Sequence, residues 1–297
     1  MKNFVGQVKG KNKDGKVICV GLDIDPEKIP ESLYGEKDVI EMAKLRPGIL
    51  STSDLTAVCV VEFARHIVCA TKDLVCAYKI NRGFFDAMGC GGVMALRNIV
   101  AMISALAPDV PIIVDSKRGD IGNSNKKYLE ADVENLPGVN AVTVNPYTGS
   151  EDSLDVFLSQ EDLGVIALCR TSNGGAREIQ DLIVDGEPLF IHVARKIQGE
   201  WNDNGNCCVV AGATYPEELK RIREAVGYLP ILIPGVGAQG GDLEAVLKNG
   251  FRGEEGPVIV NSSRGIIYAS SGPDFAEAAR KKVEEMNEIV ARYLASN

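Results

Sequence analysis

Eight short apolar runs recur along the chain, and polar or glycine residues bound each of them. Most runs are rich in β-branched residues and lack the alternation of a half-exposed strand. Strands of a parallel sheet that is covered on both faces have this composition. The pattern therefore predicts eight buried strands, at Val17–Leu22, Leu74–Tyr78, Ile112–Val114, Ala141–Val144, Val165–Cys169, Cys207–Ala211, Ile231–Ile233 and Val258–Val260.

Segments with apolar residues at helical spacing lie between the runs, and eight such units favour one (β/α)8 barrel over a doubly wound sheet. We expect a single α/β domain over residues 1–297, a TIM barrel with extra N-terminal and loop segments at 25–50, 172–188 and 199–206. The helices are predicted at Leu55–Ala70, Val93–Leu106, Leu189–Ile197, Glu217–Val226, Asp242–Asn249 and Pro273–Ala295.

The composition narrows the classes of partner. The chain has 297 residues, of which 45% are hydrophobic, and a formal net charge of −9, which argues against nucleic acid or an anionic membrane surface as a partner. The N-terminus has no apolar signal core, and no uninterrupted apolar run approaches the roughly 20 residues of a membrane helix. An anionic substrate would need a local cluster of basic residues.

The cysteines and histidines predict no metal site. The 8 cysteines are scattered, and no Cys-x-x-Cys pair or Cys/His spacing fits zinc. They are typical of buried thiols in a cytoplasmic protein. The only histidines, His66 and His192, lie in predicted helices and are interpreted as structural. General acid–base chemistry would therefore fall to lysine, aspartate and glutamate.

A charged hexapeptide, residues 115–120, follows the third run and reads Asp-Ser-Lys-Arg-Gly-Asp. If the strand continues, Asp115 and Lys117 point the same way because side chains alternate with period two. Asp120 then follows in a turn at Gly119. A solvated loop of mixed charge is the alternative. Three ionisable groups are costly to desolvate unless they serve each other or a ligand.

Nearly all of the conspicuous polar and glycine-rich segments follow predicted strands. In a (β/α)8 barrel the active site is built at the carboxyl ends of the strands. Chance would distribute such groups over both rims, so their common placement favours a site over a solvated loop. The groups are Asp23, Lys79, Asp115, Lys117, Arg170–Gly175, Pro234–Gly241 and Asn261–Gly265.

The loop after the seventh run formally matches a dinucleotide fingerprint, with glycines at positions 235, 237 and 240. It belongs to the seventh β unit, however, and no βαβ half-domain follows it. Glycines after strands seven and eight also supply bare N–H groups for a phosphate, and Arg264 adds a permanent bidentate cation. The pattern favours a phosphate monoester over NAD, and a purely structural turn stays open.

On these residues the chain resembles the orotidine 5′-phosphate decarboxylase family, from Val17 to Tyr268. The Asp-x-Lys-x-x-Asp element is shared with a wider suprafamily, whereas Ser172, Gln239 and Arg264 in their own loops make the resemblance more specific. The longer chain and the Lys-Arg-Gly-Asp-Ile-Gly form resemble the larger bacterial-type branch. The motifs are Gly21–Asp23, Tyr78–Lys79, Asp115–Ser124, Thr171–Ala176, Pro234–Gln239 and Ser263–Ile266.

The resemblance implies roles for the charged residues. The lysine of the motif, here Lys117, would stabilise the carbanion at carbon six of the pyrimidine and then protonate it. Asp115 and Asp120 match the flanking carboxylates, and with Lys79 they would form an alternating network of zero formal charge. The resemblance implies no metal and no organic cofactor.

The resemblance also implies a binding site for orotidine 5′-phosphate and a homodimer. Asp120, Ile121 and Ser124 would complete the site of the neighbouring subunit, where Ser124 stands in place of the threonine of many relatives. The remaining positions divide among ribose (Asp23, Lys79), pyrimidine (Ser172), pyrimidine and phosphate together (Gln239) and phosphate (Arg264 with backbone near Gly237 and Ser263), with Pro234 in the same loop.

Two other functions stay open at this point. One is a magnesium-dependent sugar-phosphate decarboxylase or aldolase-like lyase of the same suprafamily, in which the acidic groups would hold Mg²⁺ through oxygen. The other is a non-catalytic protein that binds a phosphate ligand on a barrel scaffold.

Overall fold

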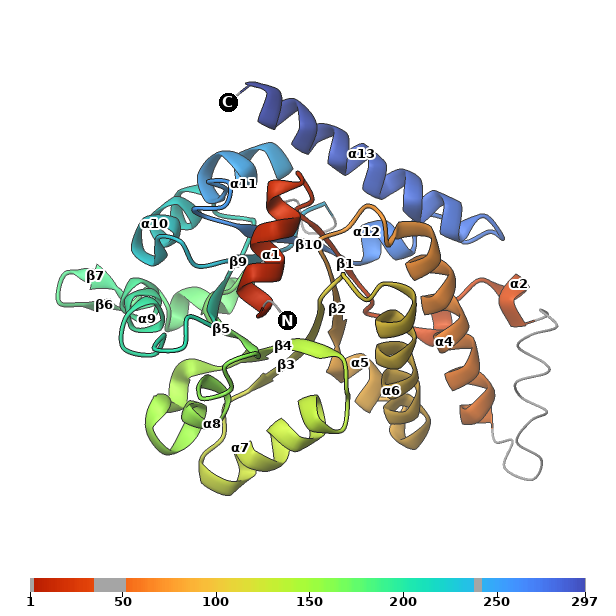
Figure 1. Cartoon of the computed structure of the whole chain (residues 1–297), viewed down its shortest axis with the longest axis horizontal. Helices are drawn as coiled ribbons and strands as arrows, with labels where there is room; N and C mark the ends of the chain where they lie inside the picture. The colour runs from red at the N-terminus through yellow and green to blue at the C-terminus, as the bar shows by residue number, and fades with distance from the viewer. Residues whose placement is uncertain (1–2, 35–51, 238–241, 297) are drawn as a thin grey trace.

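The computed structural model describes residues 3–34, 52–237 and 242–296. Within them, eight parallel strands close into a barrel that helices surround (Figure 1). The strands follow chain order around the barrel, and the last pairs with the first, so the predicted α/β barrel is confirmed. The strands are β1 (Ile18–Gly21), β2 (Ala77–Asn81), β3 (Ile112–Arg118), β4 (Val139–Val144), β5 (Gly164–Arg170), β8 (Cys207–Ala211), β9 (Ile231–Pro234) and β10 (Val258–Ser262).

Two strands extend by three or more residues past the apolar runs that predict them. The run Leu74–Tyr78 begins too early, because Leu74 still lies in the turn after a helix, where its N–H donates to Thr71. β2 instead continues to Asn81, and β3 continues through Lys117 to Arg118. Polar residues can occupy these strand ends because they face the rim of the barrel, where charged partners satisfy them.

The predicted helices are confirmed with boundary shifts of a few residues. They are α4 (Thr52–Thr71), α6 (Gly89–Leu106), α9 (Leu189–Gln198), α10 (Pro216–Val226), α11 (Leu243–Gly250) and α13 (Phe275–Ser296). The structure adds shorter helical elements: α1 (Phe4–Lys13), η1 (Pro26–Lys28), α2 (Glu31–Tyr34), α5 (Arg82–Asp86), α7 (Gly122–Leu129), η2 (Glu130–Glu134), η3 (Pro146–Thr148), η4 (Ser150–Leu154), α8 (Asp155–Leu158), η5 (Gly174–Glu178) and α12 (Arg264–Ile267).

Helix α1 covers one mouth of the barrel (Figure 1). Its apolar residues Phe4, Val5 and Val8 pack into the cluster formed by the inward-facing side chains of the strands. The fit is close, because a Cβ on Gly164 would lie 2.2 Å from the Phe4 ring. Since α1 closes the mouth on the amino side of the strands, the opposite rim is the one open to a ligand.

Helix α6 is the most apolar helix of the outer layer. Its 18 residues have a mean hydropathy of 1.5, which by length and composition alone would suit a membrane span. In the structure, Ala95, Leu96 and Ile99 are buried in the core between the strands and the outer helices, and α6 packs beside α4 and α5. Packing against the barrel therefore accounts for part of the apolar surface of α6.

Two predictions need correction: that residues 172–188 form a loop, and that the cysteine thiols are buried. The predicted loop 172–188 contains a small antiparallel hairpin, β6 (Ile183–Val184) with β7 (Glu187–Pro188), which is too short to leave a sequence pattern. The thiols are not uniformly buried, since Cys69 and Cys90 are exposed. The predicted segment 25–50 lies outside the described residues from position 35 onward.

Candidate active site

A pocket of about 290 Å³ opens at the carboxyl ends of β1, β2, β3, β9 and β10. This is the rim at which the sequence predicts the site. Asp23, Lys79, Asp115, Pro234, Ser263 and Arg264 were all expected there, and the structure brings them together. The full lining is Asp23, Lys79, Asn81, Phe84, Asp115, Pro234, Gly235, Val236, Asn261, Ser262, Ser263 and Arg264.

A chain of alternating charges begins in this pocket and ends at Lys117, which is not part of the pocket lining. The Lys79 ammonium lies 3.3 Å from a carboxylate oxygen of Asp23 and 2.9 Å from one of Asp115. The other Asp115 oxygen lies 2.6 Å from the Lys117 ammonium. The order is therefore Asp23, Lys79, Asp115, Lys117, and the formal charges sum to zero. Lys79 is almost fully buried, whereas the Lys117 side chain is paired with Asp115 but 47% exposed.

The network holds two of its members, Asp115 and Lys79, in their charged forms. Burial alone would favour neutral Asp115, but the ammonium groups of Lys79 and Lys117 outweigh burial and hold the pKa of the carboxyl well below its ordinary value. Burial likewise disfavours charged Lys79, and Asp115 and Asp23 outweigh it to raise the pKa of the ammonium above its ordinary range. Lys79 and Asp115 are thus a pair of fixed, buried charges at neutral pH.

Lys117 reaches Asp115 through an irregular backbone. Between Val114 and Arg118 the strand advances four residues while β4 advances two, so regular alternation fails there. Lys117 itself has φ +51°, a left-handed conformation that is uncommon outside glycine. The expectation that the two side chains converge is therefore met, but by a bulge and not by strand alternation.

Thr143 of β4 stabilises this bulge through two hydrogen bonds. The sequence did not predict a role for Thr143. Its hydroxyl accepts a hydrogen bond from the Lys117 backbone N–H at 2.9 Å and donates one to Asp115 at 2.9 Å. The chain then passes close to Asn145, where a Cβ on Gly119 would lie 2.6 Å from a backbone oxygen. A lone threonine in an apolar strand carries no motif. Asn81 and Phe84 line the pocket and belong to no predicted motif, whereas Asn261 lies in the segment Asn261–Gly265 that the sequence placed on this rim.

The opposite wall is built from the loops after β9 and β10. Arg264 is exposed at the start of α12, next to Ser263. β1 approaches this loop so closely that a Cβ on Gly21 would lie 1.9 Å from the Ser263 hydroxyl. Gly237 follows β9 with φ +81°. Gln239 lies outside the described residues.

Ser172 lies elsewhere on the same rim. It follows β5, and its backbone and Cβ lie about 3 Å from where a Cβ on Gly212, after β8, would stand. The Thr171 hydroxyl and backbone N–H bond to Gln180, which ties this loop to the residues that follow η5. Ser172 is not among the residues that line the pocket around Lys79, although it follows a strand of the same rim.

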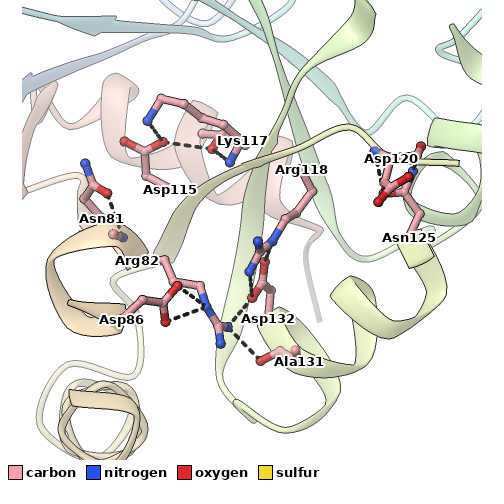
Figure 2. A network of polar contacts seen from close by, with 12 residues as sticks. Asn81, Arg82, Asp86, Asp115, Lys117, Arg118, Asp120, Asn125, Ala131 and Asp132 are labelled. Carbon is pink, nitrogen blue, oxygen red and sulfur yellow. Dashed lines mark hydrogen bonds and ion pairs between the residues drawn. The ribbon is translucent and has the colours of Figure 1, made fainter. Parts of the chain in front are cut away.

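Asp120 lies apart from the charged chain, and Ile121 and Ser124, which follow it, are exposed. The Asp120 carboxylate accepts a hydrogen bond from the Ile121 N–H, and Figure 2 shows it beside Asn125 and apart from Lys117. Buried Asn125 holds the loop by bonding the Asp120 backbone and the Ser153 carbonyl. Ile121 is 64% exposed. Within the described part of the chain, Asp120 forms no ion pair with a lysine.

Replacing Asp115 with Asn should lower the free energy of unfolding by about 3 kcal/mol, because Lys79 would stay buried with a weakened partner. The pKa of Asp115 is below that of the unfolded chain, so the loss is complete above about pH 4 and shrinks as pH falls further. Lys79 has a raised pKa, so its contribution persists until pH exceeds the ordinary lysine range. Urea denaturation of the wild type and of Asp115→Asn from pH 3 to 9 measures this difference in the free energy of unfolding.

The matched control is Asp73→Asn, which removes an exposed ion pair with Arg280 on the surface of the barrel. Its cost should be under about 1 kcal/mol. Equal losses from the two substitutions would contradict a buried, mutually stabilised network.

Fold and pocket together define a TIM-barrel enzyme with a group of paired lysine and aspartate charges at the carboxyl rim. The comparisons with known proteins agree. The model of the orotidine 5′-phosphate decarboxylase / HUMPS family matches residues 16–281, and the chain belongs to this family.

Relatives match nearly the whole chain. An orotidine 5′-phosphate decarboxylase of Aromatoleum aromaticum is 42% identical over 278 residues, covering 93% of this chain and 94% of that protein. One from Dechloromonas aromatica is 41% identical over 291 residues, covering 98% and 99%. The solved structure of Leishmania donovani OMP decarboxylase superposes with a TM-score of 0.75 at 31% identity, covering 97% of this chain and 98% of that one.

Within the described residues, no group of three or more His, Cys, Asp or Glu side chains could hold a metal ion. The space between Asp23 and Asp115 is instead occupied by the Lys79 ammonium.

Proposed function

We propose that the chain decarboxylates orotidine 5′-phosphate to uridine 5′-phosphate without a metal or organic cofactor, with Lys117 as the residue that acts on carbon six. The observation that carries the proposal is the Lys117 ammonium, half exposed and held 2.6 Å from a carboxylate that Lys79 also binds. Such a cation is positioned before the reaction begins, which is the requirement for stabilising a charge that develops in the transition state.

The reaction would proceed in two balanced steps. The bond from carbon six to the carboxylate breaks, carbon dioxide leaves, and the electron pair stays on carbon six beside the Lys117 ammonium. Lys117 then transfers a proton from Nζ to carbon six and regains one from water. Because its neighbours are already charged and buried, little reorganisation accompanies the build-up of negative charge.

The remaining residues would hold the substrate. Asp23 and Lys79 would bind the ribose hydroxyls, and Ser172 the pyrimidine amide. Arg264 with backbone groups of Ser263 and Gly237 would bind the phosphate, while Gln239 would bridge pyrimidine and phosphate beside Pro234. Binding energy from the distant phosphate can be used at carbon six if it holds the ring against Lys117.

The catalytic network would be completed by a second subunit. Asp120 faces away from Lys117 of its own chain, next to the exposed Ile121 and Ser124. In a homodimer these three residues would enter the neighbouring site, and Asp120 would become the second carboxylate beside Lys117. We further propose that residues 1–297 form one catalytic domain and that the protein is cytoplasmic, as its content of unpaired thiols suggests.

The direct test is to incubate chelator-treated protein with orotidine 5′-phosphate and to follow the loss of its ultraviolet absorbance. Full turnover in the presence of the chelator is expected. Activity that requires added Mg²⁺ would favour the magnesium-dependent lyase, and tight binding of the nucleotide without product would favour the non-catalytic binder.

Replacing Arg264 with Ala should raise KM for orotidine 5′-phosphate by about 10- to 100-fold, since a charged hydrogen bond to phosphate contributes roughly 1.5–3 kcal/mol. Arg264 is exposed, so the free energy of unfolding should not change. Steady-state kinetics measure the effect, with the exposed Arg292 of α13 replaced by Ala as the control. A change in KM below about threefold would place the phosphate elsewhere.

A further inference from the structure

A fully buried carboxylate lies behind the charged pocket. The side chain of Asp132, in η2 between α7 and β4, is 0% exposed. Two arginines reach it from different elements. Arg118 donates from Nε to one carboxylate oxygen at 2.8 Å and from Nη2 to the other at 3.3 Å, and Arg82 donates from Nη1 to that second oxygen. Figure 2 shows both guanidinium groups converging on Asp132.

Both arginines stand at the ends of the strands that carry the two lysines. Arg118 is the last residue of β3 and follows Lys117 directly. Arg82 is the first residue of α5 and follows the last residue of β2, three positions after Lys79. One carboxylate therefore joins the carboxyl ends of β2 and β3 on the side away from the pocket.

The cluster is satisfied on every side. Arg82 also donates to Asp86 and to the Ala131 carbonyl, and the Arg118 guanidinium lies 4.1 Å from the centre of the Tyr128 ring. Two guanidinium groups face two carboxylates, so the formal charges cancel. We expect the cluster around Asp132 to be rigid, because the loss of any one partner would leave a desolvated charge without its counter-charge.

The backbone at Lys117 needs such a restraint. Its φ of +51° is strained for a residue with a side chain, and strained residues persist only where their surroundings hold them. Thr143 holds the N–H on one side of Lys117. Asp132 holds the next side chain, Arg118, on the other side.

We propose that Asp132 is a positioning residue for Lys117, which fixes the bulge of β3 through Arg118 and holds it in register with β2 through Arg82. This inference rests on the proposed function, because it assigns a role in placing the lysine that acts on carbon six. Asp132 itself touches neither the pocket nor the substrate.

The test is the kinetics of Asp132→Asn, which keeps the shape of the side chain but removes its charge and one acceptor oxygen. We expect kcat to fall by about 10- to 100-fold, because a misplacement of about 1 Å costs a reaction that much. KM and the affinity for uridine 5′-phosphate should change less than threefold, since the phosphate loops follow β9 and β10. A role only in folding would leave kcat of the folded protein unchanged.

The matched control is Asn12→Ala at the opposite mouth of the barrel. Asn12 is buried and bonds the Lys16 carbonyl and both backbone groups of Val258, so its loss should also destabilise the fold. Its kcat should equal that of the wild type. A fall in kcat for Asn12→Ala as large as that for Asp132→Asn would overturn the inference, as would an unchanged kcat in folded Asp132→Asn.

If Asp132→Asn does not fold, Arg118→Lys alone tests the inference. Arg118→Lys keeps the charge but cannot form the paired bonds, so kcat should fall with KM nearly unchanged. Where Asp132→Asn does fold, adding it to Arg118→Lys should lower kcat by less than the product of the two single effects, because the two residues share a contact. An unchanged kcat in Arg118→Lys would overturn the inference. Absence of turnover in the wild type would instead remove the proposed function.

Discussion

Replacement of Lys117 by Ala should lower the turnover of orotidine 5′-phosphate by about 10⁴-fold or more, because both a preorganised cation and the proton donor are lost. The fold should be retained. The Lys117 side chain is 47% exposed, and Asp115 keeps its contacts with Lys79 and Thr143 when Lys117 is truncated. Loss of ultraviolet absorbance measures turnover, and circular dichroism with urea denaturation measures the fold.

The assay requires protein from a host without its own orotidine 5′-phosphate decarboxylase, since a trace of host enzyme would hide a loss of this size. Lys117→Arg is the matched variant. It restores the positive charge but is a poor proton donor, because the pKa of arginine is too high. It should remain far below the wild type. Turnover by Lys117→Ala within tenfold of the wild type would refute the assigned role.

A heterodimer of one Lys117→Ala subunit and one Asp120→Ala subunit should have about half the activity of the wild-type dimer, although each variant alone is inactive. If Asp120 serves the neighbouring subunit, one site of the heterodimer carries both lesions and the other carries neither. Co-expression with two different affinity tags isolates the heterodimer, and its turnover per dimer is then measured.

The opposite arrangement gives a different result. If Asp120 acted in its own subunit, each site of the heterodimer would carry one lesion and no activity would return. A protein that sediments as a monomer at assay concentration while fully active would contradict the shared site as well. The orientation of Asp120, bonded to its own backbone and away from Lys117, is the observation on which this prediction stands.

The sequence predicted the barrel because each strand corresponds to a short apolar run that can be recognised without knowledge of the rest of the chain. Buried strands such as Cys207–Ala211 and Ile231–Pro234 are apolar throughout, and the helices between them have a distinct period. The terminal helix α1 was missed because only a few of its residues are apolar, and its role depends on which mouth it covers.

The candidate site was predictable where its residues form motifs. The sequence singled out Asp23, Lys79, Asp115 and Lys117, and the structure links them in one chain of ion pairs. It also placed Arg264 on the same rim. Strand alternation was the wrong reason to expect Asp115 and Lys117 side by side. A bulge between Val114 and Arg118 brings them together, and the sequence pattern does not reveal a bulge.

By itself, therefore, the sequence determined the eight β units, the rim that carries the polar groups and the identity of the charged residues there. Each of these depends on residues that are near one another in the chain. The tertiary structure alone decided the order of charges around Asp115, the hold of Thr143 on the bulge and the meeting of Arg82, Arg118 and Asp132. Those contacts join residues from separate elements, and only the closure of the barrel brings them within bonding distance.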